Sequence, residues 1–405
     1  MEVACFLGGY GIDFFEQCAR EYEKMHPHVT INVWGNPRVW EQLIPRFASG
    51  TPPDLCWPGW GINKWSLVLN GQVYPMGEHL QQPAYGVDKK WIDTFVPSLL
   101  EVGRYDGHYY LLPHNLDTFG WWYNERLFEE HGWSPPRTYG QLLELCEAIK
   151  KEHIAPVTFA GRAPVYALWG FFFPWAISAG GIEVYNRAQN LEPGAWKDPA
   201  FLKAARCVME MKRRGYFQGG LVGMSGTESQ MEFLVGRAAM IPCGSWLHNE
   251  MKDVIPSDFR MEFIRGPVFE EGVGDPTCMF GDGSDWLVPA KAKHPDVASD
   301  FFRYMTSPDK AREFLEQKGS LMCIADLGEV KVPSYMEKPL QFVNQAKSLW
   351  GIEYSVWYPE LETEIQNAFI DFYCELLTPE EFVERVEKAA TITREDPSIP
   401  KFKIK

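Results

Sequence analysis

The 405-residue chain lacks several features that would assign it to a large class of proteins. It has no run of eighteen apolar residues, so we expect no membrane-spanning helix. It has no excess of basic side chains: 39 Lys and Arg face 54 Asp and Glu, and the net charge of -15 opposes binding to nucleic acid. Its nine cysteines form no C-x-x-C pair and no zinc-finger spacing. We therefore expect most of them to be free thiols, with one disulfide among Cys243, Cys278 and Cys323 left open.

The signatures of common enzyme classes are also missing. No nucleophile elbow, H-E-x-x-H motif, phosphate-binding loop or dinucleotide glycine motif occurs. Acidic residues are plentiful, so a glycosidase with paired carboxylates stays open as an alternative from composition alone. The segment 281–285, Gly-Asp-Gly-Ser-Asp, lacks the remaining ligands of a calcium loop. We expect no catalytic residue, no cofactor and no metal.

Tryptophan, in contrast, is abundant, with sixteen residues in the chain. Many of them stand beside Gly, Pro, Asp or Asn, where the chain is expected to turn rather than to run through a core. An indole on a loop presents a large, flat apolar face and loses little side-chain entropy when it packs. Flat apolar faces beside carboxylates and amides suit a sugar ring, which is apolar on both faces and hydroxylated at its rim.

Alternating strand and helix patterns predict an α/β fold. A strand at Val3–Leu7 leads through a glycine-rich turn into a helix at Asp13–Met25, whose apolar residues recur on one face. A second strand at 29–34, a helix at 40–49 and a short buried strand at 54–57 follow. This order of elements is typical of a parallel sheet.

A second α/β block is expected after a turn signal at 105–108 and a long extended stretch at 109–123. Its predicted elements, in order, are helices at 124–130 and 140–151, a strand at 154–159, helices at 163–179 and 198–214, and a strand at 238–243. After an extended segment at 281–289, the remaining elements are helices at 295–305, 310–318, 359–377 and 382–390. Capping residues support several of these helices, among them Thr138, Ser307 and Thr378.

Four motifs occur in an order that is shared with one protein family. They are Gly50–Asp54 (GTPPD), Gly107–Asn124 (GHYYLLPHNLDTFGWWYN), Gly236–Trp246 (GRAAMIPCGSW) and Ser307–Leu321 (SPDKAREFLEQKGSL). Through these motifs the chain resembles the extracellular solute-binding proteins of ABC importers, specifically their family 1 sugar-binding group. Each motif alone is weak, but the four together span most of the chain.

The resemblance implies a two-lobed, periplasmic-binding-protein-like α/β fold of type II, with a ligand cleft between lobes that are joined by crossover segments. The implied N-terminal lobe is 1–111 plus 286–324, and the implied C-terminal lobe is 114–281 plus 330–405. Hinge segments are expected near 111–117, 281–287 and 322–330. Closure of the lobes about these segments is the motion that such an architecture predicts.

The resemblance also implies a function. The protein is expected to bind a mono- or oligosaccharide in the cleft and to deliver it, as a monomer, to the membrane permease of an ABC transporter. It is expected outside the cytoplasm, in the extracellular or periplasmic space, free or anchored by a lipid, with its signal segment absent from this sequence. Two alternatives stay open: the same fold binding a polyamine or another charged solute, and a carbohydrate-active hydrolase.

Candidate ligand-binding residues come from the crossovers and from the aromatic loops. The resemblance places a sugar-binding carboxylate at Asp117, which can accept strong hydrogen bonds from hydroxyls, with Asn115 on the same strand face. It also makes Trp246, next to Ser245, the best candidate for stacking on a sugar ring. The other candidates are Gly9 and Tyr10 after the first strand, Trp57 and the more exposed Trp60 after the third, Trp175, Asp282 and Asp285 on the second crossover, and Tyr354 and Trp357, with Trp350 as an alternative to Trp357.

Overall fold

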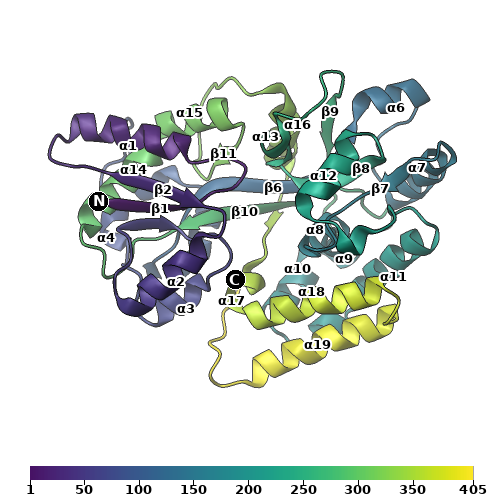
Figure 1. Cartoon of the computed structure of the whole chain (residues 1–405). Helices are drawn as coiled ribbons and strands as arrows, with labels where there is room; N and C mark the ends of the chain where they lie inside the picture. The colour runs from purple at the N-terminus through teal and green to yellow at the C-terminus, as the bar shows by residue number, and fades with distance from the viewer. Residues whose placement is uncertain (405) are drawn as a thin grey trace. The chain divides into compact units, whose positions relative to one another are not determined.

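The computed structural model describes residues 1–404, and the chain divides into two compact units (Figure 1). The first unit comprises Met1–Asp117 and Asp282–Met336, and the second comprises Thr118–Gly281 and the chain from Glu337 onward. The polypeptide therefore passes from one unit to the other three times. The N-terminal lobe expected from the sequence, 1–111 plus 286–324, is shorter than the first unit at each of these three points.

The first unit is built on a three-stranded parallel sheet with the order β2-β1-β3. Strand β1 (Glu2–Phe6) pairs with β2 (Asn32–Asn36) on one side and with β3 (Leu55–Trp57) on the other. Helices α1 (Asp13–Met25) and α2 (Val39–Ser49) connect these strands. The strand and helix alternation predicted for the N-terminal region is therefore confirmed.

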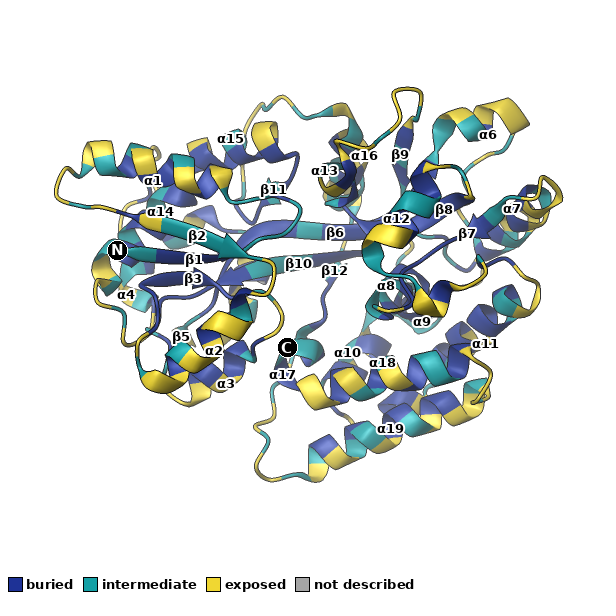
Figure 2. Ribbon diagram, viewed as in Figure 1, coloured by how far each residue is buried: buried dark blue, intermediate teal, exposed yellow. Residues whose placement is uncertain are grey.

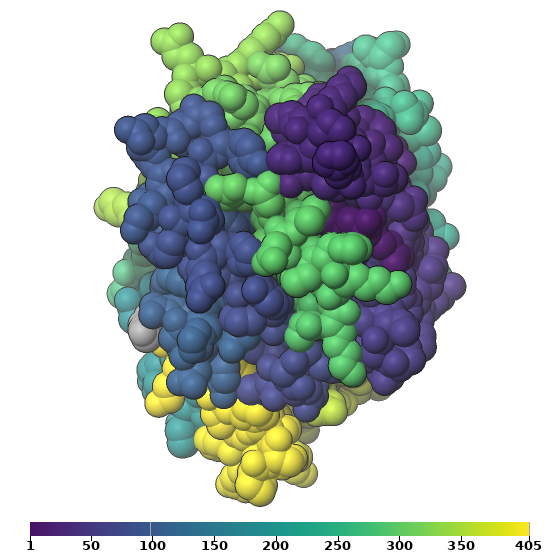
Figure 3. Space-filling model, turned by 90° about the vertical axis from the view of Figure 1, so that its left-hand side faces the viewer, coloured from purple at the N-terminus to yellow at the C-terminus, as the bar shows by residue number. Residues whose placement is uncertain are grey.

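The later segment of the first unit packs directly onto the earlier one. In α14 (Pro295–Met305), Phe301 lies against Tyr22 of α1, with ring centroids 5.4 Å apart, and Phe302 lies against Trp91 at 6.0 Å. Figure 3 shows this green segment at the surface between the purple N-terminal segment and the blue segment that follows it. The two sequence segments thus form one folded body.

Short elements complete the first unit. The next helix, α15 (Pro308–Lys318), begins after the predicted N-cap Ser307 and ends at Gly319, whose φ of 53° lies in the left-handed region that favours glycine. The remaining elements are α3 (Lys64–Leu69), α4 (Gly77–Leu80), η1 (Trp91–Thr94), α5 (Pro97–Val102), β4 (Arg104–Tyr105), β5 (His108–Tyr109) and β11 (Leu321–Met322). Strands β4 and β5 form the hairpin predicted at 105–108.

Two long strands, β6 (Leu112–Asn124) and β10 (Met279–Trp286), supply residues to both units. The first half of β6 pairs with β11, where Leu321 lies opposite Leu116. The second half pairs with β8 (Ala238–Gly244) and β9 (Met261–Ile264). At the two edges of this sheet, β7 (Ala155–Val157) pairs with β8, and β12 (Leu349–Trp350) pairs with β10.

Helices surround the sheet of the second unit, and Figure 2 shows buried and exposed residues alternating along α18 and α19. These two helices contact each other through Phe372 and Phe382, whose rings stack at 4.9 Å. The helical elements of this unit are α6 (Glu125–His131), α7 (Tyr139–Lys151), α8 (Val165–Ala167), the π-helical η2 (Leu168–Phe172), α9 (Phe173–Gly180), α10 (Ile182–Gln189), η3 (Ala195–Lys197), α11 (Pro199–Arg213), η4 (Leu221–Gly223), α12 (Gly226–Leu234), α13 (Leu247–Met251), α17 (Glu353–Trp357), α18 (Pro359–Tyr373) and α19 (Pro379–Glu395). Helix α16 (Ser334–Gln345) begins in the first unit and continues in the second.

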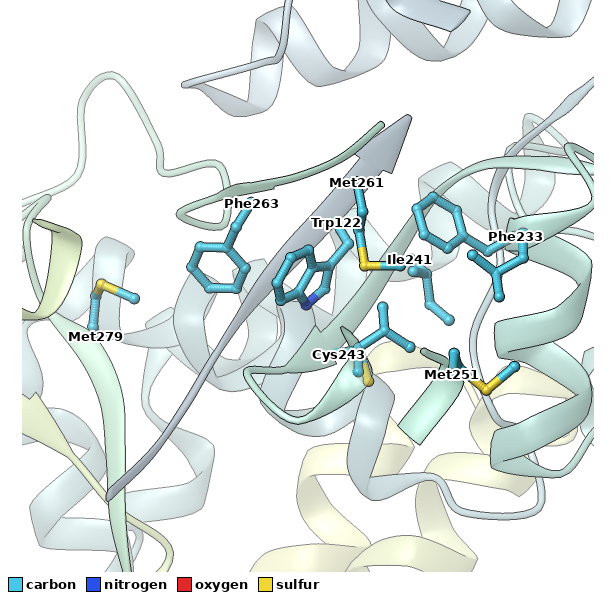
Figure 4. Close-up of a cluster of buried hydrophobic side chains, with 10 residues drawn as sticks. Trp122, Phe233, Ile241, Cys243, Met251, Met261, Phe263 and Met279 are labelled. Carbon is cyan, nitrogen blue, oxygen red and sulfur yellow. The ribbon is translucent and has the colours of Figure 1, made fainter. Parts of the chain in front are cut away.

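One core cluster of the second unit lies where β6, β8 and β9 meet (Figure 4). Trp122 is fully buried there, with its indole edge-on to Phe263 at 4.9 Å. Its Nε1 donates to the carbonyl oxygen of Gly244 at 3.1 Å. Because both the ring and its polar atom are satisfied inside the core, Trp122 is a structural residue.

Three expectations about the whole chain can be compared with this structure. All nine cysteines are free, which confirms that most are thiols and leaves no disulfide among Cys243, Cys278 and Cys323. Within residues 1–404 no single helix has the length and apolar character to cross a membrane, whereas the pair Val165–Gly180 and Ile182–Gln189, bent by 116°, meets both conditions together. In the same residues no group of three or more His, Cys, Asp or Glu could hold a metal ion.

Candidate functional site

An exposed indole stands at the carboxyl edge of the β2-β1-β3 sheet, which is the edge where ligands of parallel α/β sheets bind. Trp60 follows β3 and is 73% exposed. Its ring lies 4.6 Å from that of Phe6, the last residue of β1, and 5.3 Å from that of Trp40 in α2. A Cβ on Gly61 would lie only 2.3 Å from the Trp40 indole, so glycine is needed for this loop to pack. We call Phe6, Trp40 and Trp60 the aromatic platform.

A hydrogen-bonded carboxylate forms the second feature of the first unit. Asp117 is partly exposed at the point in β6 where the first unit ends. Its Oδ1 accepts from the Tyr10 hydroxyl at 2.7 Å. Its Oδ2 accepts from Nδ2 of Asn115 at 2.9 Å and from Oγ of Ser284 at 3.4 Å. Asn115, which we expected on the same strand face as Asp117, therefore contacts it directly.

No positive charge balances this carboxylate. Among the described residues no basic side chain forms an ion pair with Asp117, and burial raises its pKa to about 6, although the three hydrogen bonds oppose that rise. Another acid on β10 has a basic partner, because Lys64 Nζ lies 2.5 Å from Oδ2 of Asp285 and both side chains are buried. Asp285, which we expected to contact a ligand, is instead one half of a buried ion pair.

Aromatic side chains from four elements gather in the second unit. The half-buried Trp246 lies edge-on to Phe119 at 5.9 Å, and so does Trp169 of η2, also at 5.9 Å. Trp169 in turn stacks on Phe280 at 5.5 Å with an interplanar angle of 20°. A Cβ on Gly244 would lie 2.0 Å from the Trp246 indole, so this ring lies flat on the backbone of β8. The predicted Trp246 is thus part of an aromatic wall formed by Phe119, Trp169, Trp246 and Phe280.

Trp169 is a wall residue that we did not single out from the sequence as a site residue. It lies in a segment that also contains Phe171, Phe172 and Phe173, which are all buried. One available signal was the number of aromatic residues in this segment. Three phenylalanines already fill its buried face, so a further indole has to lie elsewhere. Trp169 is half-buried, whereas the three phenylalanines are at most 1% exposed.

A cavity of about 30 Å³ borders this wall, lined by Trp169, Phe280, Arg265, Cys278 and Trp350 among others. Its size suits about one water molecule and is too small for a sugar ring. The guanidinium of Arg265 donates to the carbonyl oxygens of Pro276 and Phe342, at 3.3 and 3.5 Å. Arg265 therefore ties two backbone segments together, while its buried Nε has no hydrogen-bond partner within residues 1–404.

Several predicted site residues lie in cores. Trp175 is fully buried and its Nε1 donates to the carbonyl oxygen of Pro267 at 3.0 Å. Tyr354 is also fully buried, and Trp357, 8% exposed, stacks on Phe402 at 5.5 Å. In each case neighbouring aromatic rings cover the side chain, so the structure corrects the expectation that these three contact a ligand. The alternative to Trp357, Trp350, is 3% exposed and lies edge-on to Phe280.

The remaining candidates are Trp57, Ser245, Gly9 and Asp282. Trp57 is 7% exposed and stacks on Trp286 at 6.0 Å, beneath the aromatic platform. Ser245 is buried, and its Oγ accepts from the backbone N–H of Thr118 at 3.4 Å. Gly9 lies in the turn after β1 that brings Tyr10 to Asp117, and Asp282 is half-buried on β10. Ligand contacts by Gly9 and Asp282 stay predictions.

Comparison with known proteins identifies both a family and relatives. The profile of a family described as bacterial extracellular solute-binding protein matches residues 17–336. The diacetylchitobiose binding protein NgcE of Streptomyces coelicolor is 27% identical over 416 residues, which cover 100% of this chain and 87% of that protein. The multiple sugar-binding protein of Streptococcus mutans is 23% identical over 322 residues, which cover 77% of this chain and 72% of that protein.

Solved structures share the fold over nearly the whole chain. A protein from work on xylan utilization by Caldanaerobius polysaccharolyticus superposes with a TM-score of 0.83 at 19% identity, covering 96% of this chain and 99% of its own. A chitin oligosaccharide binding protein gives a TM-score of 0.81 at 19% identity, with 97% and 98% covered. The protein RafE in complex with raffinose gives 0.72 at 21% identity, with 97% and 98% covered. These likenesses confirm the predicted α/β fold class.

Proposed function

The chain belongs to the bacterial extracellular solute-binding protein family, and from this premise we propose that it binds a carbohydrate and delivers it to the membrane permease of an ABC importer. Membership confirms the predicted class, a solute-binding protein rather than an enzyme. The names of its relatives support the choice of solute, since they include binding proteins for diacetylchitobiose and for multiple sugars.

The observation that carries the proposal is the exposed indole of Trp60. The indole of Trp60 is 73% exposed, so most of its apolar surface is open to solvent, while contacts with Phe6 and Trp40 hold the ring in place. A sugar ring that stacks on this face buries apolar surface on both sides without any further ordering of the indole. The aromatic platform is therefore preorganised for a flat, uncharged ring.

Asp117 supplies the polar half of recognition in the first unit. A carboxylate accepts hydrogen bonds from sugar hydroxyls that are stronger than those between neutral groups. Tyr10 and Asn115 fix the direction of its two oxygens before any ligand arrives. The first unit thus offers a stacking surface and a charged acceptor.

Trp246 and Trp169 are the candidates in the second unit. That one ligand contacts both units, and that the units close around it at the three crossing segments, remain predictions drawn from the family resemblance. The hinge segments near residues 111–117, 281–287 and 322–330 share that status. We expect the protein to act outside the cytoplasm as a monomer.

Isothermal titration calorimetry with a ligand panel tests the proposal. The panel contains N,N′-diacetylchitobiose, raffinose, xylan-derived oligosaccharides and spermidine. Saturable binding of at least one sugar, with the sugar recovered intact, is the expected result. Binding of spermidine without any response to sugars would assign the site to polyamines, and released sugar products would assign it to a hydrolase. Loss of uptake of the bound sugar in cells that lack the gene tests delivery to the permease.

A further inference from the structure

The hydrogen bonds already made by Asp117 limit what it can do for a ligand. An ionised carboxylate has about four acceptor positions, two on each oxygen. Asn115 and Ser284 occupy both positions of Oδ2, at 2.9 and 3.4 Å. Tyr10 occupies one position of Oδ1, at 2.7 Å. One acceptor position on Oδ1 is left.

Tyr10 is held in this arrangement by its surroundings. Its side chain is 7% exposed, and its ring lies edge-on to Phe314 of α15 at 5.8 Å. The phenol therefore cannot swing away to make room for a second ligand hydroxyl without breaking an apolar contact. We had expected Tyr10 itself to bind the ligand, but its hydroxyl hydrogen points to Asp117.

The other titratable groups described around this carboxylate are acids, a thiol and a neutral imidazole, and none of them supplies a positive charge. On β10, Asp285 is paired with Lys64, and Asp282 is the second acid of that strand. After β11, the Cys323 thiol is buried, and burial followed by the charges of Asp117, Asp282 and Asp285 raises its pKa well above the usual range. Beside Asn115, burial lowers the pKa of His114 to about 3, so this ring is neutral. Among the described residues only neutral donors stabilise ionised Asp117, and Tyr10 makes the shortest of these bonds.

We propose that Tyr10 is a positioning residue which leaves Asp117 a single open acceptor, so that Asp117 contacts the carbohydrate through one hydroxyl group only. This inference rests on the proposed function. It narrows the ligand chemistry, because a bidentate contact between Asp117 and a vicinal diol is excluded while Tyr10, Asn115 and Ser284 keep their hydrogen bonds. It also separates two roles: Asp117 touches the ligand, and Tyr10 acts through Asp117.

Calorimetry with monodeoxy analogues tests the single contact. The analogues are made from the tightest binder among N,N′-diacetylchitobiose, raffinose and xylan-derived oligosaccharides, and each is titrated into wild-type protein and into Asp117→Asn. One analogue should lose on the order of 10- to 100-fold in affinity for the wild type and little for Asp117→Asn, since it lacks the hydroxyl that Asp117 holds. Two analogues with equal Asp117-dependent losses would overturn the proposal.

The Tyr10→Phe variant tests the positioning role, and Phe retains the ring contact with Phe314. Removing the phenol reopens the second position of Oδ1, so a second deoxy analogue should become Asp117-dependent. The Asp117 carboxyl, followed by carbon-13 NMR without ligand, should titrate near pH 6 in the wild type and at higher pH in Tyr10→Phe. Tyr85→Phe is the matched control, because Tyr85 also donates to a carboxylate, that of Asp300 at 2.9 Å. Equal titration of wild type and Tyr10→Phe would overturn the positioning role.

The two tests separate this inference from the function on which it rests. If no sugar on the panel binds the wild type, the proposed function fails, and the single-contact inference fails with it. If a sugar binds but two hydroxyls depend equally on Asp117, only the inference fails.

Discussion

The phenol of Tyr10 donates to Oδ1 of Asp117 at 2.7 Å, and 107 positions of sequence separate the two residues. This bond steadies a carboxylate whose pKa is raised by burial from 3.8 to about 6. The ionised form of Asp117, which accepts hydrogen bonds best, is therefore the form that burial destabilises in the folded protein. This destabilisation has a measurable consequence in the dependence of stability on pH.

We expect the melting temperature of Asp117→Asn, relative to that of the wild type, to increase as pH rises from 4 to 7. A carboxyl group whose pKa is raised in the folded state stabilises the fold below its unfolded pKa, and this stabilisation is lost as pH rises through the folded value near 6. The effect amounts to at most about 3 kcal/mol. Scanning calorimetry at several pH values measures it, and a difference in melting temperature that is constant with pH would contradict it.

Trp60→Ala should weaken sugar binding by about 1–3 kcal/mol and leave the melting temperature nearly unchanged, because the indole is 73% exposed. Trp133→Ala serves as a control, since Trp133 is a half-buried indole that stacks on His131 at 4.4 Å in the second unit, whereas the platform belongs to the first. Calorimetry should find normal affinity for the control. Normal sugar affinity in Trp60→Ala would show that the aromatic platform does not contact the ligand.

Gly244→Ala should displace the Trp246 indole, because the new methyl carbon would lie 2.0 Å from it. The expected result is a changed tryptophan fluorescence spectrum together with weaker sugar binding, if Trp246 contacts the ligand. Gly226→Ala is the matched control, since nothing lies within 4 Å of its added carbon. A changed spectrum with unaltered affinity would place Trp246 outside the binding site.

Lys64→Met should lower stability by roughly 3–5 kcal/mol, because it leaves the buried Asp285 carboxylate unpaired. The double variant Lys64→Met with Asp285→Leu should regain most of that loss, since it leaves no isolated charge. Chemical denaturation of the two single variants and the double variant gives the coupling energy. Additive losses of stability in the two single variants would show that Lys64 and Asp285 have no coupling energy.

His114 predicts the opposite pH trend to Asp117. Its ring is fully buried, and burial lowers its pKa from 6.5 to about 3. A depressed folded-state pKa means stability that is present above the unfolded value and lost as pH falls toward 3. His114→Leu should therefore resist acid better than the wild type, by up to about 4 kcal/mol at low pH. Parallel acid denaturation curves for the two proteins would contradict this.

The sequence predicted the regular elements well where the end signals are local. Helix α1 occupies Asp13–Met25 as expected, since Pro27 stands just beyond it, and Thr378 with Glu381 forms the predicted capping box of α19. These signals depend on neighbours within four residues. The π-helical turn of η2 was not predicted, because it has no such local signature.

The site was predicted less well, because exposure of a tryptophan depends on what packs over it. Trp60 and Trp175 look alike in sequence, each beside a residue that favours a turn or a break. Trp60 is 73% exposed and Trp175 is fully buried among rings from distant segments. The contact between Asn115 and Asp117 could have been predicted from the sequence, since residues two apart share a strand face. The hydrogen bond from Tyr10 could not, because it depends on the tertiary fold.

The interleaving of the first unit has a consequence for how the protein is made. Its earlier segment ends at Asp117, but α14 and Ser284 belong to a stretch that begins only at Asp282. During synthesis, a nascent chain must emerge for well over a hundred further residues before that body can finish folding. Until then Tyr22 and Trp91 lack the apolar partners, Phe301 and Phe302, that α14 supplies.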